Sequence, residues 1–158
     1  MNSSDLIGTA KRLAGGKGKP KQSDLRRAVS TLYYAMFHEL ARACADHLAG
    51  TNPRERSNAA WRQTYRSLSH GYVISQCRDN RFKNGKFPQC IKDFAIDFEE
   101  MQIKRHSADY DPDCKLRRSL VSADIKLVEK SIAAYRTATL KHKKAFSVYV
   151  LLRTQSKK

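Results

Sequence analysis

The sequence has no run of about 18 or more apolar residues, so it offers no helix that could cross a membrane. Its N-terminal stretch MNSSDLIGTAKRLAGG lacks the apolar centre of a secretory signal peptide, and we therefore expect a cytoplasmic protein. Glycine and proline are scarce, at seven and four residues, whereas alanine, leucine, lysine and arginine are plentiful. This composition favours helices, and 158 residues are enough for one domain with a real hydrophobic core.

Motifs that would hold a metal or a cofactor are also missing. The sequence has no H-E-x-x-H pair, no glycine-rich phosphate loop and no nucleophile elbow. Its four cysteines are far apart and form no C-x-x-C pair, so we expect reduced thiols rather than a zinc or redox site. Asp93, Asp97 and Glu100 share one helix face, but Lys104 lies among them, which predicts a solvated stripe. We therefore predict no metal and no cofactor.

Acidic residues are few, and this shortage is the strongest compositional feature. The chain has 31 Lys and Arg against 15 Asp and Glu, for a formal net charge of +16 and a pI near 10. Residues 93–113 hold seven of the acids, so the rest of the chain carries a net charge of about +21. Such charge favours a polyanion such as nucleic acid. The alternatives are a solubilising surface or a partner with an acidic face; a membrane surface is disfavoured, because the cations do not gather on one amphipathic helix.

Apolar periodicity predicts an all-α protein, an antiparallel bundle of four to six helices. The expected helices cover 3–14, a long stretch from a cap at Ser23 or Asp24 to Gly50, 58–69 with a stop at Gly71, a piece over 72–80, a helix that starts at Pro88, and 122–139. The bundle spans 23–140. A short helix and a flexible basic loop occupy 1–22, and a basic and apolar segment, 141–158, packs on the bundle. Within that segment, 145–152 fits a helix and a strand equally.

Two sets of polar residues are candidates for binding nucleic acid. Arg27, Thr31, Tyr34 and His38 are spaced by four, three and four residues, so they lie along one edge of the long helix. They form either a solvated edge, with tyrosine and histidine anchoring the bundle, or a row of donors that faces a groove or a second subunit. The second set belongs to the basic loop RDNRFKNGKF. Its cations are Arg78, Arg81, Lys83 and Lys86.

Arg105 is the most informative single position. It continues the apolar face of Phe94, Phe98 and Met101 by four residues, so its guanidinium points toward buried surroundings. A buried charge is costly unless it has a partner. Arg105 therefore either binds a nearby carboxylate, with Asp109 and Asp111 as the candidates, or projects into a functional site.

Two segments together resemble the HEPN superfamily, the helical "higher eukaryote and prokaryote nucleotide-binding" domains. SDLRRAVSTLYYAMFHEL, at Ser23–Leu40, is similar to the first core helix of that family, and RHSADYDP, at Arg105–Pro112, is similar to the A-D-Y-D-P segment before its last helix. The resemblance covers about residues 20–140. It implies an antiparallel bundle that usually forms a homodimer and binds RNA or nucleotides.

The resemblance also implies a chemistry. Many members are metal-independent endoribonucleases with an R-x4–6-H motif, in which the arginine neutralises the scissile phosphate and the histidine moves a proton from the ribose 2′-hydroxyl. Arg105 matches the arginine and His106 the polar residue after it, but Tyr110 stands where the histidine is expected. With Asp109 these are the candidate catalytic residues.

The biological setting that the resemblance implies is toxin–antitoxin or phage defence, with an antitoxin or a nucleotidyltransferase as partner. Two alternatives stay open beside a ribonuclease. One is a non-catalytic module that binds RNA or nucleotides, and the other is a scaffold subunit that binds an acidic protein.

Overall fold

The computed structural model describes residues 2–16 and 18–153, and these residues form helices and their connections, without a strand. The helices are α1 (Ser3–Gly15), α2 (Gln22–Ala49), α3 (Asn58–Ser67), α4 (His70–Arg78), α5 (Asn80–Lys83), α6 (Gln89–Tyr110), α7 (Arg118–Thr137) and α8 (Leu140–Leu151). The predicted all-α class is confirmed. The described chain has eight helices rather than four to six, because the single turn α5 and the helix α8 add to the six segments expected as helical.

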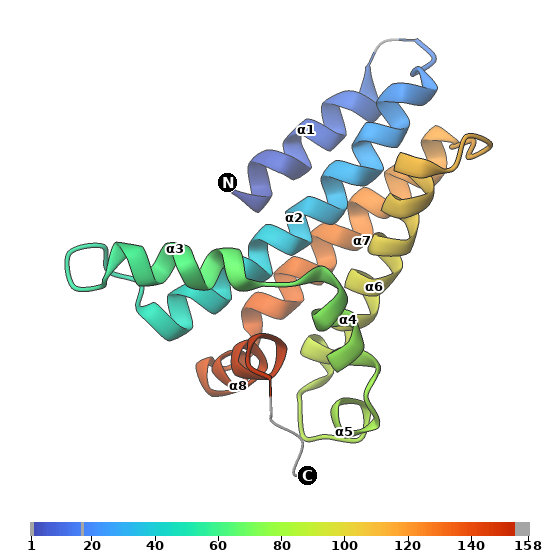
Figure 1. Ribbon diagram of the computed structural model, residues 1–158. Helices are drawn as coiled ribbons and strands as arrows, with labels where there is room; N and C mark the ends of the chain where they lie inside the picture. The colour runs from blue at the N-terminus through green and yellow to red at the C-terminus, as the bar shows by residue number, and fades with distance from the viewer. Residues whose placement is uncertain (1, 17, 154–158) are drawn as a thin grey trace.

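Four long helices build the body of the molecule. In Figure 1, α1, α2, α6 and α7 lie side by side, and each runs opposite to its neighbour along the chain. The helix α8 packs across one end of this bundle against α2 and α4. The helix α3 packs on the C-terminal half of α2 and projects away from the other long helices. The arrangement is an antiparallel bundle with one projecting arm.

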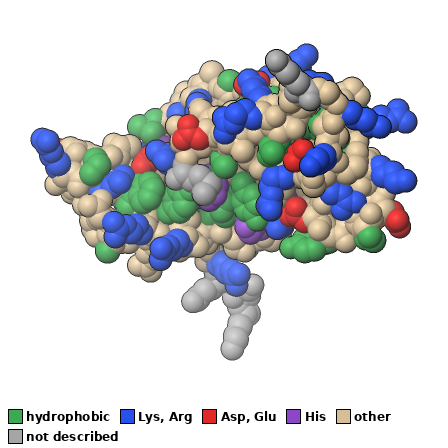
Figure 2. All heavy atoms as spheres, turned by 90° about the horizontal axis from the view of Figure 1, so that it is seen from above, with side chains coloured by type: hydrophobic (Ala, Val, Ile, Leu, Met, Phe, Trp, Pro, Cys, Tyr) green, Lys and Arg blue, Asp and Glu red, His purple; other side chains and the backbone are tan. Residues whose placement is uncertain are grey.

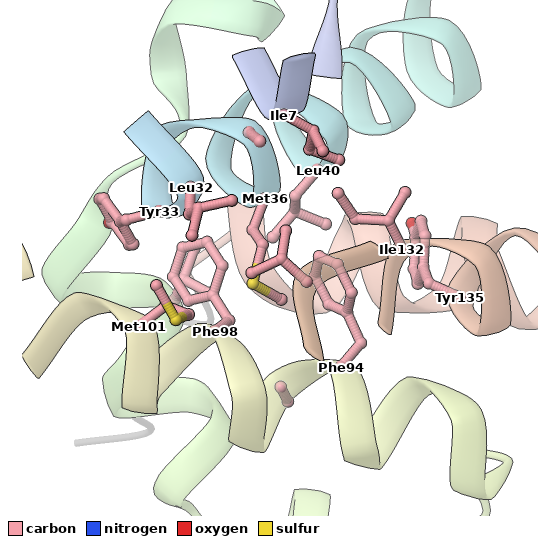
Figure 3. Packing of buried hydrophobic residues seen from close by; sticks show 14 of the residues in the cluster. Ile7, Leu32, Tyr33, Met36, Leu40, Phe94, Phe98, Met101, Ile132 and Tyr135 are labelled. Atoms are coloured by element: carbon pink, nitrogen blue, oxygen red, sulfur yellow. The ribbon is translucent and has the colours of Figure 1, made fainter. Parts of the chain in front are cut away.

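The core lies where α2 faces α6 and α7. Figure 3 shows Met36 and Leu40 of α2 opposite Phe94 of α6, with Tyr135 of α7 beside them, and all four side chains are buried. The rings of Phe94 and Tyr135 are 4.6 Å apart between centroids. These residues repeat at helical spacing in the sequence, so the apolar periodicity identified the faces that meet.

Several expected helix ends are corrected by the structure. The helix α2 starts after Lys21 without a side-chain cap, so Ser23 and Asp24 lie inside it. Gly71 does not end a helix but lies in the first turn of α4, because α3 already ends at Ser67 and the buried Leu68 separates the two. The helix α7 begins at Arg118, four residues earlier than predicted.

The two basic segments whose structure was open or predicted as loop are helical in part. The loop RDNRFKNGKF contains α5, which Asp79 caps by accepting a hydrogen bond from the Arg81 amide. Residues 145–151 belong to α8, and Thr139 caps that helix. The last part of the predicted segment 141–158 lies outside the described residues.

The chemistry of the cysteines agrees with the expectation of free thiols. Cys44, Cys77, Cys90 and Cys114 are all unpaired. Burial raises the pKa of Cys44 and of Cys77 to about 12, so both thiols are protonated near neutral pH. In the described part of the chain no three His, Cys, Asp or Glu side chains are grouped to hold a metal ion. None of its helices has both the length and the apolarity to span a membrane.

Candidate functional site

The turn after α6 is fixed to α2 by hydrogen bonds that the sequence did not predict. Arg26 donates to the backbone oxygens of Pro112, at 3.0 Å, and of Cys114, at 2.6 Å. One turn earlier in α2, the Gln22 side chain donates to the Leu116 oxygen at 2.8 Å and accepts from the Leu116 amide at 2.9 Å. These contacts hold the end of α6, and therefore Arg105, against the first half of α2.

Arg105 lies at the centre of a polar cluster. Its Nε donates to Asp109 Oδ2 at 2.8 Å, and one terminal nitrogen donates to the Tyr34 hydroxyl at 3.2 Å. The side chain is 18 % exposed, and its guanidinium carbon is within 6 Å of the ring centroids of Tyr33, Tyr34 and Tyr110. Of the two carboxylates expected as partners, Asp109 therefore pairs with Arg105, one helical turn away. The carboxylate partner predicted for Arg105 therefore lies on the same helix, α6.

One carboxylate oxygen of Asp109 accepts two hydrogen bonds. Besides the Arg105 contact, its Oδ2 accepts a hydrogen bond from the Ser30 hydroxyl of α2 at 3.2 Å. This second bond fixes the carboxylate and, through it, the plane of the guanidinium. A guanidinium has five N–H donors, and these contacts occupy two of them, so the remaining donors can reach a ligand such as a phosphate.

His70 is the residue that sequence reasoning missed. It begins α4, follows the extended Leu68–Ser69 connection, and returns to the Arg105 cluster. Its Nδ1 shares a hydrogen bond with the buried Tyr33 hydroxyl, and its ring stacks on Phe37 with centroids 4.0 Å apart. Burial lowers the pKa of His70, and the nearby Arg105 charge lowers it further, which favours the neutral ring near pH 7. No sequence motif links residue 70 to residue 105, so only the fold reveals this neighbour.

His38 lies one helical turn beyond Tyr34 on α2. Its ring centroid is 6.1 Å from that of Tyr34 and 5.8 Å from that of Tyr65 of α3, and the ring planes differ by 28° and 15°. Its Nδ1 and the Tyr65 hydroxyl are 2.5 Å apart, and burial lowers the pKa of His38. Tyr34 and His38 are half-buried and contact α3, α4 and α6, so they anchor these helices to α2. The alternative, a row of donors that faces a groove or a second subunit, stays a prediction.

The four residues proposed as catalytic are only partly brought together. Arg105 and Asp109 pair, and the Tyr110 ring lies 5.7 Å from the Arg105 guanidinium but is 65 % exposed. His106 is exposed, and its ring lies 4.8 Å from that of Tyr110. His106 lies about 100° further around α6 than Arg105 and contacts Tyr110, whereas His70 and His38 contact Tyr34. His70 and His38 are therefore better placed than His106 to act with Arg105.

The predicted nucleic-acid contacts fall in two separate places. Tyr34 and His38 belong to the Arg105 cluster, and Arg27 is exposed two turns earlier on α2. The cations of the 78–92 region belong to the end of α4, to α5 and to the loop before α6. There Arg78 pairs with Glu99 and Arg81 with Asp79, while Lys83 and Lys86 are exposed. The 78–92 cations do not join the Arg105 cluster.

We expect Arg105→Gln to raise the pKa of His70 toward its ordinary value of 6.5, because the substitution removes a positive charge beside the ring. The pKa should stay below 6.5, since burial is unchanged. An NMR titration of the histidine ring protons measures this shift. His47, near the C-terminal end of α2, is the internal control. Burial and Lys143 lower its pKa, so its titration should not change in the Arg105→Gln variant. Equal shifts in both rings would contradict the local effect.

Comparisons of the chain with family models, with curated proteins and with solved structures find no match in any of the three. The interpretation of the cluster therefore depends on its own geometry and on the sequence resemblance.

Proposed function

We propose that this chain is an HEPN-like protein that binds RNA and cleaves it at the Arg105 cluster without a metal ion. The observation that supports this proposal best is the position of His70 beside Arg105, which supplies the imidazole that the sequence motif lacks. A cation that can neutralise a phosphate and a neutral imidazole that can accept a proton are the two groups that metal-free RNA cleavage needs.

The roles follow from the contacts. Arg105, oriented by Asp109, binds the scissile phosphate through its unoccupied N–H donors, and the Tyr34 hydroxyl adds a donor. His70 has Nδ1 engaged with Tyr33, so Nε2 is the nitrogen that takes the proton from the ribose 2′-hydroxyl. The 2′-oxygen then attacks phosphorus and the bond to the 5′-oxygen breaks. That oxygen takes up a proton from water, and the protonated His70 returns its proton to solvent. The products are a 2′,3′-cyclic phosphate and a 5′-hydroxyl.

The test is RNA cleavage in excess chelator by the wild type, His70→Asn and His106→Asn. We expect His70→Asn to lower the rate by about 100-fold or more, the usual worth of a general base, and His106→Asn to stay near wild type. His106 is a matched control because it is a histidine next to Arg105 in sequence that contacts Tyr110 rather than Tyr34. A loss confined to His106→Asn would contradict the proposed role of His70.

Absence of cleavage by the wild type, with RNA affinity that falls steeply as salt increases, would leave the non-catalytic RNA-binding alternative. Absence of both would favour the scaffold that binds an acidic protein. The homodimer, the toxin–antitoxin or phage-defence setting, and an antitoxin or nucleotidyltransferase partner rest on the resemblance alone and stay predictions.

A further inference from the structure

A continuous row of four aromatic rings leads away from Arg105 along α2 and α3. We call it the ring row, and its members are Tyr34, His38, Tyr65 and Trp61. Successive centroids are 6.1, 5.8 and 5.2 Å apart, and successive ring planes differ by 28°, 15° and 22°. An arginine stands at each end: the guanidinium carbon of Arg105 is 5.5 Å from the Tyr34 centroid, and that of Arg56 is 4.5 Å from the Trp61 centroid.

The ring row is only partly covered by the rest of the protein. All four rings are half-buried, and α3 contributes no fully buried residue. The face in Figure 2 shows a band of hydrophobic and histidine side chains with Lys and Arg side chains along its borders. Partial burial is ordinary for Trp, Tyr and His, so the distinguishing feature is that four such rings form one row with an arginine at each end. These rings stay accessible along a basic surface.

The α3 arm is also strongly basic. Its preceding loop and its helix carry Arg54, Arg56, Arg62 and Arg66, against Glu55 as the one acidic residue between 51 and 69. Arg54, Arg62 and Arg66 are exposed, whereas Arg56 is half-buried and pairs with Asp46 at 3.4 Å. Exposed arginines beside accessible rings are the combination that binds single-stranded nucleic acid.

We infer that the α3 arm binds a single-stranded RNA segment that extends from the Arg105 cluster along the ring row. This inference deepens the proposed function and rests on it. His38 and Tyr65 meet edge to edge, with Nδ1 and the hydroxyl 2.5 Å apart and the ring planes 15° apart, so neither ring covers the face of the other. Bases of the RNA stack on the exposed parts of the ring faces, while the arginines of α3 bind phosphates. Because such contacts need unpaired bases and read no base edges, the ligand is single-stranded RNA without strong sequence preference.

An acidic protein would pair with the arginines of the arm, but its carboxylates would make no stacking contact with the ring row. A duplex would satisfy the charge too, but its bases are paired and stacked inside. The ring row therefore selects the single strand among the polyanions that the charge attracts.

Trp61 gives this inference a direct readout, because it is the only tryptophan in the chain. We expect an oligouridine of about ten nucleotides, within the usual site size of single-strand binders, to change Trp61 emission. A duplex of the same length and a polyglutamate of similar charge should leave the emission nearly unchanged. Equal responses to all three probes would overturn the preference for a single strand.

Substitution of the arm separates this inference from the proposed function. Arg62→Gln with Arg66→Gln should lower the slope of log affinity against log salt by about 2, because each arginine contributes about one phosphate contact. Lys126→Gln with Lys130→Gln on α7 is the matched control, with the same charge change and the same spacing, and should keep the slope. RNA binding that depends on Arg105 but not on Arg62 and Arg66, with unchanged Trp61 emission, would overturn the inference and leave the Arg105 proposal standing. No RNA binding at all would overturn both.

Discussion

Arg105→Ala is expected to slow RNA cleavage by at least about 100-fold, the typical cost of removing a preorganised group that stabilises developing charge. In the wild type, Asp109 and Tyr34 fix the Arg105 guanidinium before RNA binds, so RNA binding loses little conformational entropy at this side chain. The rate of RNA cleavage at saturating RNA measures the effect. Arg105→Lys should recover only part of the loss, because an ammonium keeps the charge but not the planar fork.

Two controls keep this result interpretable. Arg118→Ala removes an exposed arginine at the start of α7, away from the cluster, and should cleave RNA like the wild type. Circular dichroism and thermal unfolding show whether Arg105→Ala stays folded. A folded Arg105→Ala protein with wild-type cleavage would contradict the assignment of Arg105 to the scissile phosphate.

Phe94→Ala is expected to lower the free energy of unfolding by about 3–5 kcal/mol, the usual cost of deleting a fully buried aromatic side chain. Phe94 is 0 % exposed and lies between Phe98 and Tyr135, where α6 meets α7, so its removal leaves a cavity in the centre of the bundle. That loss is a large share of the stability of an ordinary domain. Denaturant unfolding followed by circular dichroism measures it.

Ile96→Ala is the matched control for Phe94→Ala. Ile96 is on the same helix, two residues away, and is 62 % exposed. Its substitution should change the free energy of unfolding by no more than about 0.5 kcal/mol. Equal losses for the two variants would mean that α6 packs with a different face than the structure describes.

The fold could be predicted where one physical rule dominates. The apolar spacing of α2 and α6 identified their buried faces, and Pro88 marked the start of α6. Helix ends were less predictable, because α2 begins without a side-chain cap and the glycine at 71 lies inside a helix. A single Gly is a weak stop signal when a neighbouring buried residue, here Leu68, already sets the break.

The candidate site could be predicted only from its own helix. Arg105 needed a carboxylate, and helical spacing made Asp109 a candidate. Two contacts of the site leave no pattern in the local sequence: the hydrogen bonds from Arg26 to the turn after α6, and the packing of His70 beside Tyr33. In both, the partners are more than 30 positions apart in the chain. The same limit applies to the ring row, whose members His38 and Tyr65 meet only through the α2–α3 packing.

The most direct test of the central claim is an NMR titration of the protein with a short single-stranded RNA, observed at the side chains. We expect the Arg105 Nε–H and His70 ring signals to shift in proportion to the RNA bound, while the signals of His142 on α8 do not move. RNA binding that shifts the basic residues of the 78–92 region and of α8 but leaves Arg105 and His70 unchanged would contradict the central claim.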